Sequence, residues 1–148
     1  MASTRSLRQI GVVLLAALIV ACSGKPNTAP AGGVSSMQSM EVKPGTGEAI
    51  TPGKIAVVQY TGWLYDAAAK DNKGKQFDSS RNGAGPFRFP LGTGQVIKGW
   101  DQGVTGMKVG ESRRLIIPAD MAYGDSGAGG VIPPGATLVF DIDLVAIE

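Results

Sequence analysis

The 148-residue sequence predicts an α+β domain in which an antiparallel β-sheet packs over one short α-helix. Apolar and polar residues alternate with a period of two over residues 137–147, as expected for a strand with one buried face. Only residues 96–104 show helical spacing, with Ile97, Trp100 and Val104 on one face. All nine aromatic residues and eighteen glycines lie within residues 40–148, which favours short strands joined by tight turns.

Six strands are expected in this domain, at residues 38–43, 55–64, 76–79, 87–90, 113–117 and 137–147. In the last strand the alternation places an apolar row on one face and Asp141 and Asp143 on the other. Paired carboxylates can perform acid–base chemistry, but their interleaving with a core-facing row favours a solvated sheet face. The helical segment contains Gly99 and Gly103, which are poor helix formers, so tertiary contacts must hold it.

The first 39 residues predict an export signal and a tether that precede the domain. Residues 1–21 combine Arg5 and Arg8 with an apolar run over residues 10–21. As a helix that run would be about 18 Å long, too short for a hydrocarbon core of about 30 Å, so a signal peptide is expected. Residues 22–39 are rich in small and polar residues with Lys25 as their only charge, which predicts a flexible tether. The folded domain is expected at residues 40–148.

Charge and residue usage exclude several classes of function. The net charge of +2 belongs to Arg5 and Arg8, because basic and acidic residues are equal in number beyond residue 21, which argues against a nucleic-acid partner. The absence of histidine excludes Ser-His-Asp and Cys-His catalysis, and a single cysteine excludes an internal disulfide. Residues 92–94 read Gly-Thr-Gly but lack the third glycine of a nucleotide loop. We therefore expect neither a metal nor a cofactor.

The only cysteine, Cys22, directly follows the apolar run. The sequence Ile19-Val20-Ala21-Cys22-Ser23 resembles the bacterial lipobox. That resemblance implies that Cys22 is acylated and becomes the new N-terminus, with several acyl chains anchoring the protein stably to a lipid membrane. Ser23 resembles a sorting signal for the outer membrane of a Gram-negative cell. An ordinary secretory signal with a chance cysteine is the alternative.

Six short blocks within the domain carry the functional signal. Taken singly, each has a plain structural interpretation: Trp100 as a core residue, Asp78 as a turn cap and Tyr123 as a loop aromatic. Their order along the chain is distinctive, namely Tyr60-Thr61-Gly62, Gly74-Lys75-Gln76-Phe77-Asp78-Ser79-Ser80, Pro86-Phe87-Arg88-Phe89, Val96-Ile97-Lys98-Gly99-Trp100, Tyr123-Gly124 and a last block that runs from Val131 to Asp141. Together they resemble the FKBP-type peptidyl-prolyl isomerases over residues 40–148.

The resemblance implies a twisted antiparallel sheet wrapped around a short helix, with an aromatic-lined pocket between them. Carried over by motif, the catalytic positions are Tyr60, Asp78, Trp100, Tyr123 and Phe140, with Trp100 as the pocket floor. The substrate-binding positions are Phe77, Phe87, Val96, Ile97, Val131 and Ile132. The implied activity is peptidyl-prolyl cis-trans isomerisation during the folding of exported proteins.

Three features depart from the family pattern. Residues 66–75 form a longer connection than the minimal one, which predicts an exposed excursion. Gly83 stands where an arginine that steadies the pocket carboxylate is often found, so Asp78 is expected to be less tightly oriented. Ala128 stands where a histidine often sits. These differences bear on substrate preference and on affinity for macrolide ligands more than on activity.

Two further functions compete with a membrane-tethered isomerase. A binding module could keep the fold without catalysis, and a dedicated chaperone would normally carry an added domain. Retention of the five catalytic positions favours the isomerase. Because no helical arm precedes residue 40, a monomer is expected, and proline-containing polypeptides are its expected partners.

Overall fold

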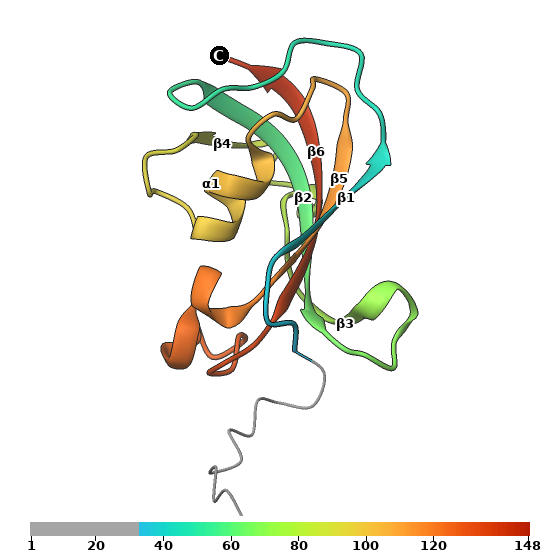
Figure 1. The fold of residues 1–148 in the computed structure, drawn as a ribbon, viewed down its shortest axis with the longest axis vertical. Helices are drawn as coiled ribbons and strands as arrows, with labels where there is room; N and C mark the ends of the chain where they lie inside the picture. The colour runs from blue at the N-terminus through green and yellow to red at the C-terminus, as the bar shows by residue number, and fades with distance from the viewer. Residues whose placement is uncertain (1–32) are drawn as a thin grey trace, which may run out of the picture.

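The structure is a computed structural model that describes residues 33–148. Its centre is a twisted antiparallel sheet with one α-helix, α1 (Lys98–Val104), against one face (Figure 1). The expected α+β fold is thereby confirmed. The strands, in chain order, are β1 (Gln38–Lys43), β2 (Ile55–Tyr65), β3 (Lys73–Ser79), β4 (Phe87–Pro90), β5 (Ser112–Ile117) and β6 (Leu138–Ile147).

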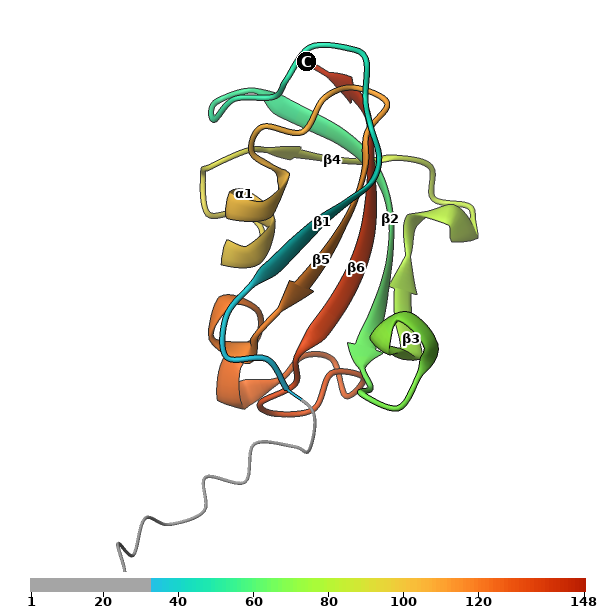
Figure 2. The ribbon, with the colours of Figure 1, turned by 45° about the vertical axis from the view of Figure 1, so that its right-hand side comes forward.

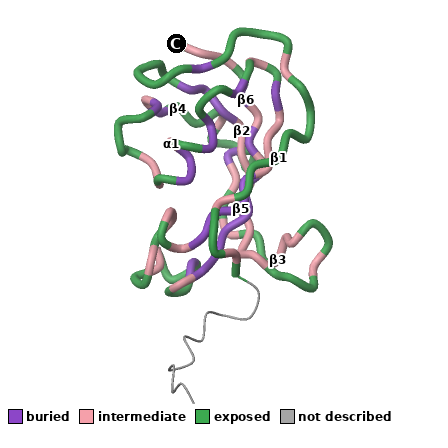
Figure 3. Tube along the Cα trace, viewed as in Figure 1, coloured by how far each residue is buried: buried purple, intermediate pink, exposed green. Residues whose placement is uncertain are grey.

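The strand order places the two longest strands in the middle of the sheet. Neighbours run β1-β5-β6-β2-β3, and β4 pairs with the first part of β2. Figure 2 shows α1 and β4 on one side of the sheet and the β3 turn on the other. The core lies between α1 and the sheet, and Figure 3 shows the buried stretches gathered there along β2, β5 and β6.

Strand β6 confirms the period-two pattern on its core face, where Leu138, Phe140, Ile142 and Leu144 are each at most 3% exposed. The expectation of a solvated opposite face holds only in part: Val145 is exposed, but the rest of that face is more covered than predicted. Val139 on that face is fully buried, and Asp141 and Asp143 are half-buried. Both carboxylates take part in ion pairs with cationic side chains from neighbouring elements, which a single-strand pattern cannot show.

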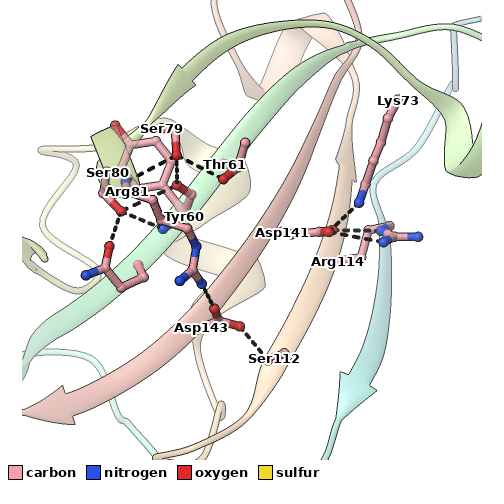
Figure 4. A network of polar contacts seen from close by, with 11 residues as sticks. Tyr60, Thr61, Lys73, Ser79, Ser80, Arg81, Ser112, Arg114, Asp141 and Asp143 are labelled. Atoms are coloured by element: carbon pink, nitrogen blue, oxygen red, sulfur yellow. Dashed lines mark hydrogen bonds and ion pairs between the residues drawn. The ribbon is translucent and has the colours of Figure 1, made fainter. Parts of the chain in front are cut away.

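The two carboxylates belong to the polar network drawn in Figure 4. Lys73 Nζ lies 2.6 Å from Asp141 Oδ2, and Arg114 Nε lies 2.7 Å from Asp141 Oδ1. Burial alone would raise the pKa of Asp141, but the hydrogen bonds from Arg114 and Lys73 outweigh it and hold that pKa below its usual range. Asp143 pairs with Arg81 and also accepts a hydrogen bond from Ser112.

The connection between β2 and β3 is shorter than expected and is fastened to the sheet. Strand β3 begins at Lys73, so the loop spans residues 66–72 and ends in a single 3-10 turn, Lys70–Asn72. Most of the loop is exposed, as predicted. However, Asp71 lies 3.5 Å from Arg114, and Lys73 Nζ sits 4.2 Å from the centre of the Trp63 ring. These contacts hold the end of the segment that leads into β3 against the sheet face opposite α1.

Helix α1 begins at Lys98, two residues later than the apolar spacing predicted. Its two glycines permit a close approach to β5. A Cβ on Gly99 would lie 2.5 Å from the Ile117 side chain, and a Cβ on Gly103 would lie 2.4 Å from Leu115. The glycines that weaken the helix locally therefore let it pack directly on the sheet. No helix in the described part of the chain is long and apolar enough to span a membrane.

Candidate active site

A cavity of about 380 Å³ opens between α1, the sheet and the loops around them. Nine of the eleven expected catalytic and substrate-binding residues line it. The full lining is Tyr60, Phe77, Asp78, Phe87, Gly94, Gln95, Val96, Ile97, Trp100, Tyr123 and Phe140. These residues come from β2, β3, β4, β6, α1 and two loops, so only the folded chain assembles the cavity.

Trp100 lies at the centre of the aromatic lining. It is 5% exposed, and its ring makes edge-on contacts with Tyr60 at 4.9 Å, Phe140 at 5.3 Å and Phe87 at 6.0 Å between ring centres. Edge-on geometry is the favoured arrangement for aromatic pairs because the positive ring edge meets the negative ring face. The contacts hold the indole rigidly while leaving part of it on the cavity wall.

A second aromatic pair depends on the missing side chain of Gly62. The Phe77 and Phe140 rings meet edge-on at 5.6 Å. A Cβ on Gly62 would lie 2.7 Å from atoms of each ring, which is closer than two carbons can approach. The glycine of the Tyr-Thr-Gly block therefore makes room for the two rings against β2.

The polar edge of the cavity is built around Asp78. The Tyr60 hydroxyl donates to Asp78 Oδ2 at 2.6 Å, and the Ser79 backbone N–H donates to Oδ1 at 2.8 Å. Two hydrogen bonds therefore orient the Asp78 carboxylate, although Gly83 stands where an arginine that would steady it is often found. Gly83 instead ends the turn Ser80–Asn82 with φ of 110°, a left-handed conformation that favours glycine.

The two tyrosines on the cavity remain protonated donors over a wide pH range. Burial, followed by the hydrogen bond to Asp78 and the charge of that carboxylate, raises the pKa of Tyr60 well above its usual range. Burial and the same carboxylate also raise the pKa of Tyr123, which is 40% exposed. Both hydroxyls therefore stay neutral near pH 7.

The residues after Asp78 tie it to the sheet (Figure 4). Ser79 Oγ lies 3.0 Å from Thr61 Oγ1, and Ser80 Oγ accepts the Tyr60 backbone N–H at 2.9 Å. Arg81 reaches across the sheet edge to Asp143. The end of β3 and the following turn are thus fixed to β2 and β6, which fixes the backbone at Asp78.

Sequence reasoning missed Gly94 and Gln95, which lie on the loop between β4 and α1. Asp101 of α1 shapes that loop, because its two carboxylate oxygens accept the backbone N–H groups of Gly92 and Gly94 at 2.9 and 3.0 Å. The signal was present in the Gly-Thr-Gly sequence of residues 92–94, which marks a tight turn before the helix.

Val131 and Ile132 do not lie on the cavity, contrary to their expected role. Ile132 is 5% exposed and belongs to the hydrophobic core, whereas Val131 is 51% exposed and lines a neighbouring hollow. Ala128 closes the loop that carries them by exchanging backbone hydrogen bonds with Ile132 at 3.0 Å. A sequence motif identified this loop, but not the direction in which its side chains point.

The cavity is mostly apolar and has a few fixed polar groups at its edge. Carbon atoms of aromatic and aliphatic residues form most of its wall, and one carboxylate and two phenol hydroxyls form its edge. Residues 33–148 contain no grouping of three or more metal-binding side chains. This arrangement suits recognition of a compact apolar ring whose neighbouring carbonyl groups need hydrogen-bond donors.

Comparison with known proteins decides the family. A family model described as FKBP-type peptidyl-prolyl cis-trans isomerase matches residues 46–145. The chain belongs to this family. It is therefore classed as an isomerase, which agrees with the family resemblance found in the sequence.

Several curated FKBP relatives are similar over most of the domain. An FK506-binding protein of Neisseria meningitidis serogroup B is 48% identical over 107 residues, which cover 72% of this chain and 92% of the relative. Peptidyl-prolyl cis-trans isomerase FPR2 of Saccharomyces cerevisiae is 53% identical over 66% of this chain and 67% of its own length. FK506-binding protein 2B of Rhizopus delemar is 56% identical over 91 residues, but the match spans only 41% of that relative.

The FKBP fold is also seen in a solved structure. The crystal structure of AtFKBP13 superposes with a TM-score of 0.66 and 35% sequence identity, covering 79% of this chain and 97% of the other. Both the sheet and the short helix described above are thus features of a known architecture.

Proposed function

We propose that this FKBP domain accelerates cis-trans isomerisation of X-Pro bonds in exported polypeptides by binding the proline in the Trp100 cavity. The observation that carries the proposal is the cavity itself, in which Trp100, Tyr60, Phe87 and Phe140 enclose an open apolar volume beside Asp78. A pyrrolidine ring fits such a container. The acting species is proposed to be a monomer.

The chemistry needs no nucleophile. A planar peptide bond owes its rotation barrier of about 18–20 kcal/mol to resonance, which separates charge between oxygen and nitrogen. A twisted amide has lost that resonance and is less dipolar. An apolar cavity therefore disfavours the planar ground state more than the twisted transition state, and only such differential stabilisation accelerates a reaction.

The polar groups would position the substrate. Ile97 is the N-cap of α1, where backbone N–H groups have no partner within the helix, and its N–H is proposed to bind a substrate carbonyl. Tyr123 is proposed to donate to a second carbonyl. Tyr60 and Asp78 would supply the polar edge beside the rotating bond, where their mutual hydrogen bond holds them in place.

A protease-coupled isomerisation assay on residues 33–148, which include all of β1, tests this function. Uncatalysed X-Pro isomerisation takes roughly tens to hundreds of seconds at 25 °C, so catalysis is read directly from the shortened slow phase. The wild-type domain should shorten the slow phase. The variants Phe140→Ala and Asp78→Ala should each shorten it less than the wild type does. Wild-type rates in both variants would refute the role of the cavity. Varying the residue before proline in the same assay measures the preference of the site.

The same cavity is proposed to accept macrolide ligands. Two of the similar proteins named above are named FK506-binding proteins, and the cavity residues matched by motif include Trp100, its aromatic floor. Competition by FK506 in the isomerisation assay would support a shared site.

Hydrogen-bonded Tyr60 predicts a flat pH profile for the reaction. Because the raised pKa keeps its hydroxyl protonated, and the chain has no histidine, the isomerisation rate should not change between about pH 6 and 9. The hydrogen bond to Asp78 contributes fully to the free energy of unfolding below the ordinary tyrosine pKa of about 10. That contribution is lost only as the pH rises through the higher pKa of Tyr60 in the folded protein. Ultraviolet difference titration should show that the last tyrosine to titrate is missing from Tyr60→Phe, while the raised pKa of Tyr123 remains. If Tyr60→Phe keeps the last titration step and loses an earlier one, the assignment is contradicted.

Lipid anchoring through Cys22 is proposed separately, from the lipobox resemblance. Cys22, the signal peptide at residues 1–21 and most of the tether lie outside the described residues. The proposed location is the outer membrane of a Gram-negative cell, with the domain attached by the tether.

Changing Cys22 to alanine tests the anchor. Cys22→Ala should abolish incorporation of radioactive palmitate and move the protein from the membrane fraction to the soluble fraction. Isomerase activity should not change, because the cavity lies entirely within residues 60–140. Continued palmitate labelling of Cys22→Ala would exclude this cysteine as the acylation site.

A further inference from the structure

A buried ion pair lies outside the cavity. It is near the C-terminal end of α1, whereas the cavity loop between β4 and α1 leads into the N-terminal end. Glu111 is 2% exposed and is the one charged residue that is fully buried within residues 33–148. Burying a carboxylate is costly unless its oxygens are paired. Here Oε2 accepts the Lys108 backbone N–H at 2.9 Å, while Oε1 lies 2.7 Å from Arg113 Nε and 2.6 Å from Nη2.

The remaining arm of Arg113 reaches the end of the helix. Arg113 Nη1 donates to the Gly103 carbonyl oxygen at 2.9 Å and lies 3.4 Å from the Thr105 carbonyl oxygen. The last carbonyl groups of a helix have no partner inside the helix, and a cation there also matches the helix dipole. Glu111 therefore orients a guanidinium that caps α1 from strand β5.

Helix α1 depends on such external contacts. It has seven residues, two of them glycine, and no side chain caps its N-terminus. A helix of this length is not stable alone. On the face toward β5, its two glycines leave space that the side chains of Leu115 and Ile117 fill, so the helix adds no side chain of its own at those two positions. The Arg113 contact joins this helix end to β5 by directional bonds.

We propose that Arg113, oriented by Glu111, is a positioning residue for isomerisation. It fixes α1 over β5 and thereby sets the place of the Trp100 indole on the cavity wall. The inference rests on the proposed isomerase function of that cavity. Arg113 itself does not line the cavity and touches no substrate.

The same strand provides a matched control. Arg114 is 14% exposed at its side chain, compared with 17% for Arg113, and it also forms an ion pair, with the half-buried Asp141. It points to the opposite face of the sheet, where it binds Asp141. Arg113→Met and Arg114→Met therefore remove similar interactions, but only the first touches α1.

The test measures activity and the environment of Trp100 together. In a Trp63→Phe background, Trp100 is the only tryptophan, so its fluorescence reports its own surroundings. With both variants assayed well below their melting temperatures, Arg113→Met should lower kcat/KM about tenfold, shift the Trp100 emission and increase its quenching by acrylamide. Arg114→Met should change kcat/KM less than about twofold and leave the emission unchanged. Arg113→Lys should restore part of the activity, because a lysine can cap the helix but cannot bind Glu111 as a fork.

Unchanged emission and activity in folded Arg113→Met would overturn the proposal, as would an equal loss of activity in Arg114→Met. If Arg113→Met does not fold, the activity and Trp100 emission of Arg113→Lys and Glu111→Gln are compared with those of Arg114→Met instead. If the wild-type domain shows no isomerase activity, the proposed function fails, and the fluorescence comparison alone decides whether Arg113 positions Trp100.

Discussion

Replacing Trp100 with leucine is expected to lower kcat/KM by about 10- to 100-fold, which corresponds to about 1.4–2.8 kcal/mol of lost transition-state stabilisation. The indole touches three aromatic rings edge-on, so its loss both removes the floor and frees Tyr60, Phe87 and Phe140 to move. Most of the effect should appear in KM if the floor only binds proline. It should appear in kcat if the floor favours the twisted amide.

The second tryptophan supplies the control for this variant. Trp63 lies on β2 beneath Lys73, outside the cavity lining. Trp63→Leu should therefore retain kcat/KM within about twofold, although both variants lose stability because each removes aromatic contacts. Equal activities of Trp63→Leu and Trp100→Leu would contradict the assignment of Trp100 as the floor.

Gly62→Ala is expected to damage the site without changing any polar group. Its new methyl would lie 2.7 Å from both the Phe77 and Phe140 rings, so one ring must turn into the cavity. Overpacking of this kind costs about 1–3 kcal/mol of stability, and the displaced ring should lower kcat/KM by at least about tenfold.

Gly74→Ala separates crowding from loss of the cavity. A Cβ there would lie 2.8 Å from the Leu64 carbonyl oxygen, which is comparable crowding at a place away from the cavity. We expect a lower melting temperature in both variants, measured by circular dichroism, but a large loss of activity only in Gly62→Ala. Full activity in Gly62→Ala would show that the Phe77–Phe140 pair does not shape the site.

The fold could be predicted from local sequence patterns, and most of the cavity lining from the resemblance of short motifs to the FKBP family. Period-two alternation located β6, and the Tyr-Thr-Gly, Phe-Asp-Ser-Ser and Val-Ile-Lys-Gly-Trp blocks named residues that the structure brings together. Such blocks are recognisable in the sequence because they contain given residue types at fixed spacing, whatever the distance between the blocks along the chain.

Features that depend on distant partners could not be predicted. Val139 is buried on the face expected to be solvated, where Asp141 pairs with Lys73, which lies 68 residues away in the chain. In the sequence Glu111 and Arg113 are ordinary charges at the start of a strand, yet the fold buries Glu111 and brings Arg113 to the end of α1. The loop at Val131 was located correctly, but the direction of its side chains depends on a turn closed by Ala128 and Ile132.

The most direct test of the cavity is exchange NMR of an X-Pro peptide with 15N-labelled domain. The two indole N–H signals report opposite faces of the sheet, since Trp100 lies on the cavity and Trp63 does not. We predict cis-trans exchange peaks in the peptide that require the protein, together with a shift of the Trp100 signal and none of Trp63. Absence of catalysed exchange, or a shift confined to Trp63, would contradict the account.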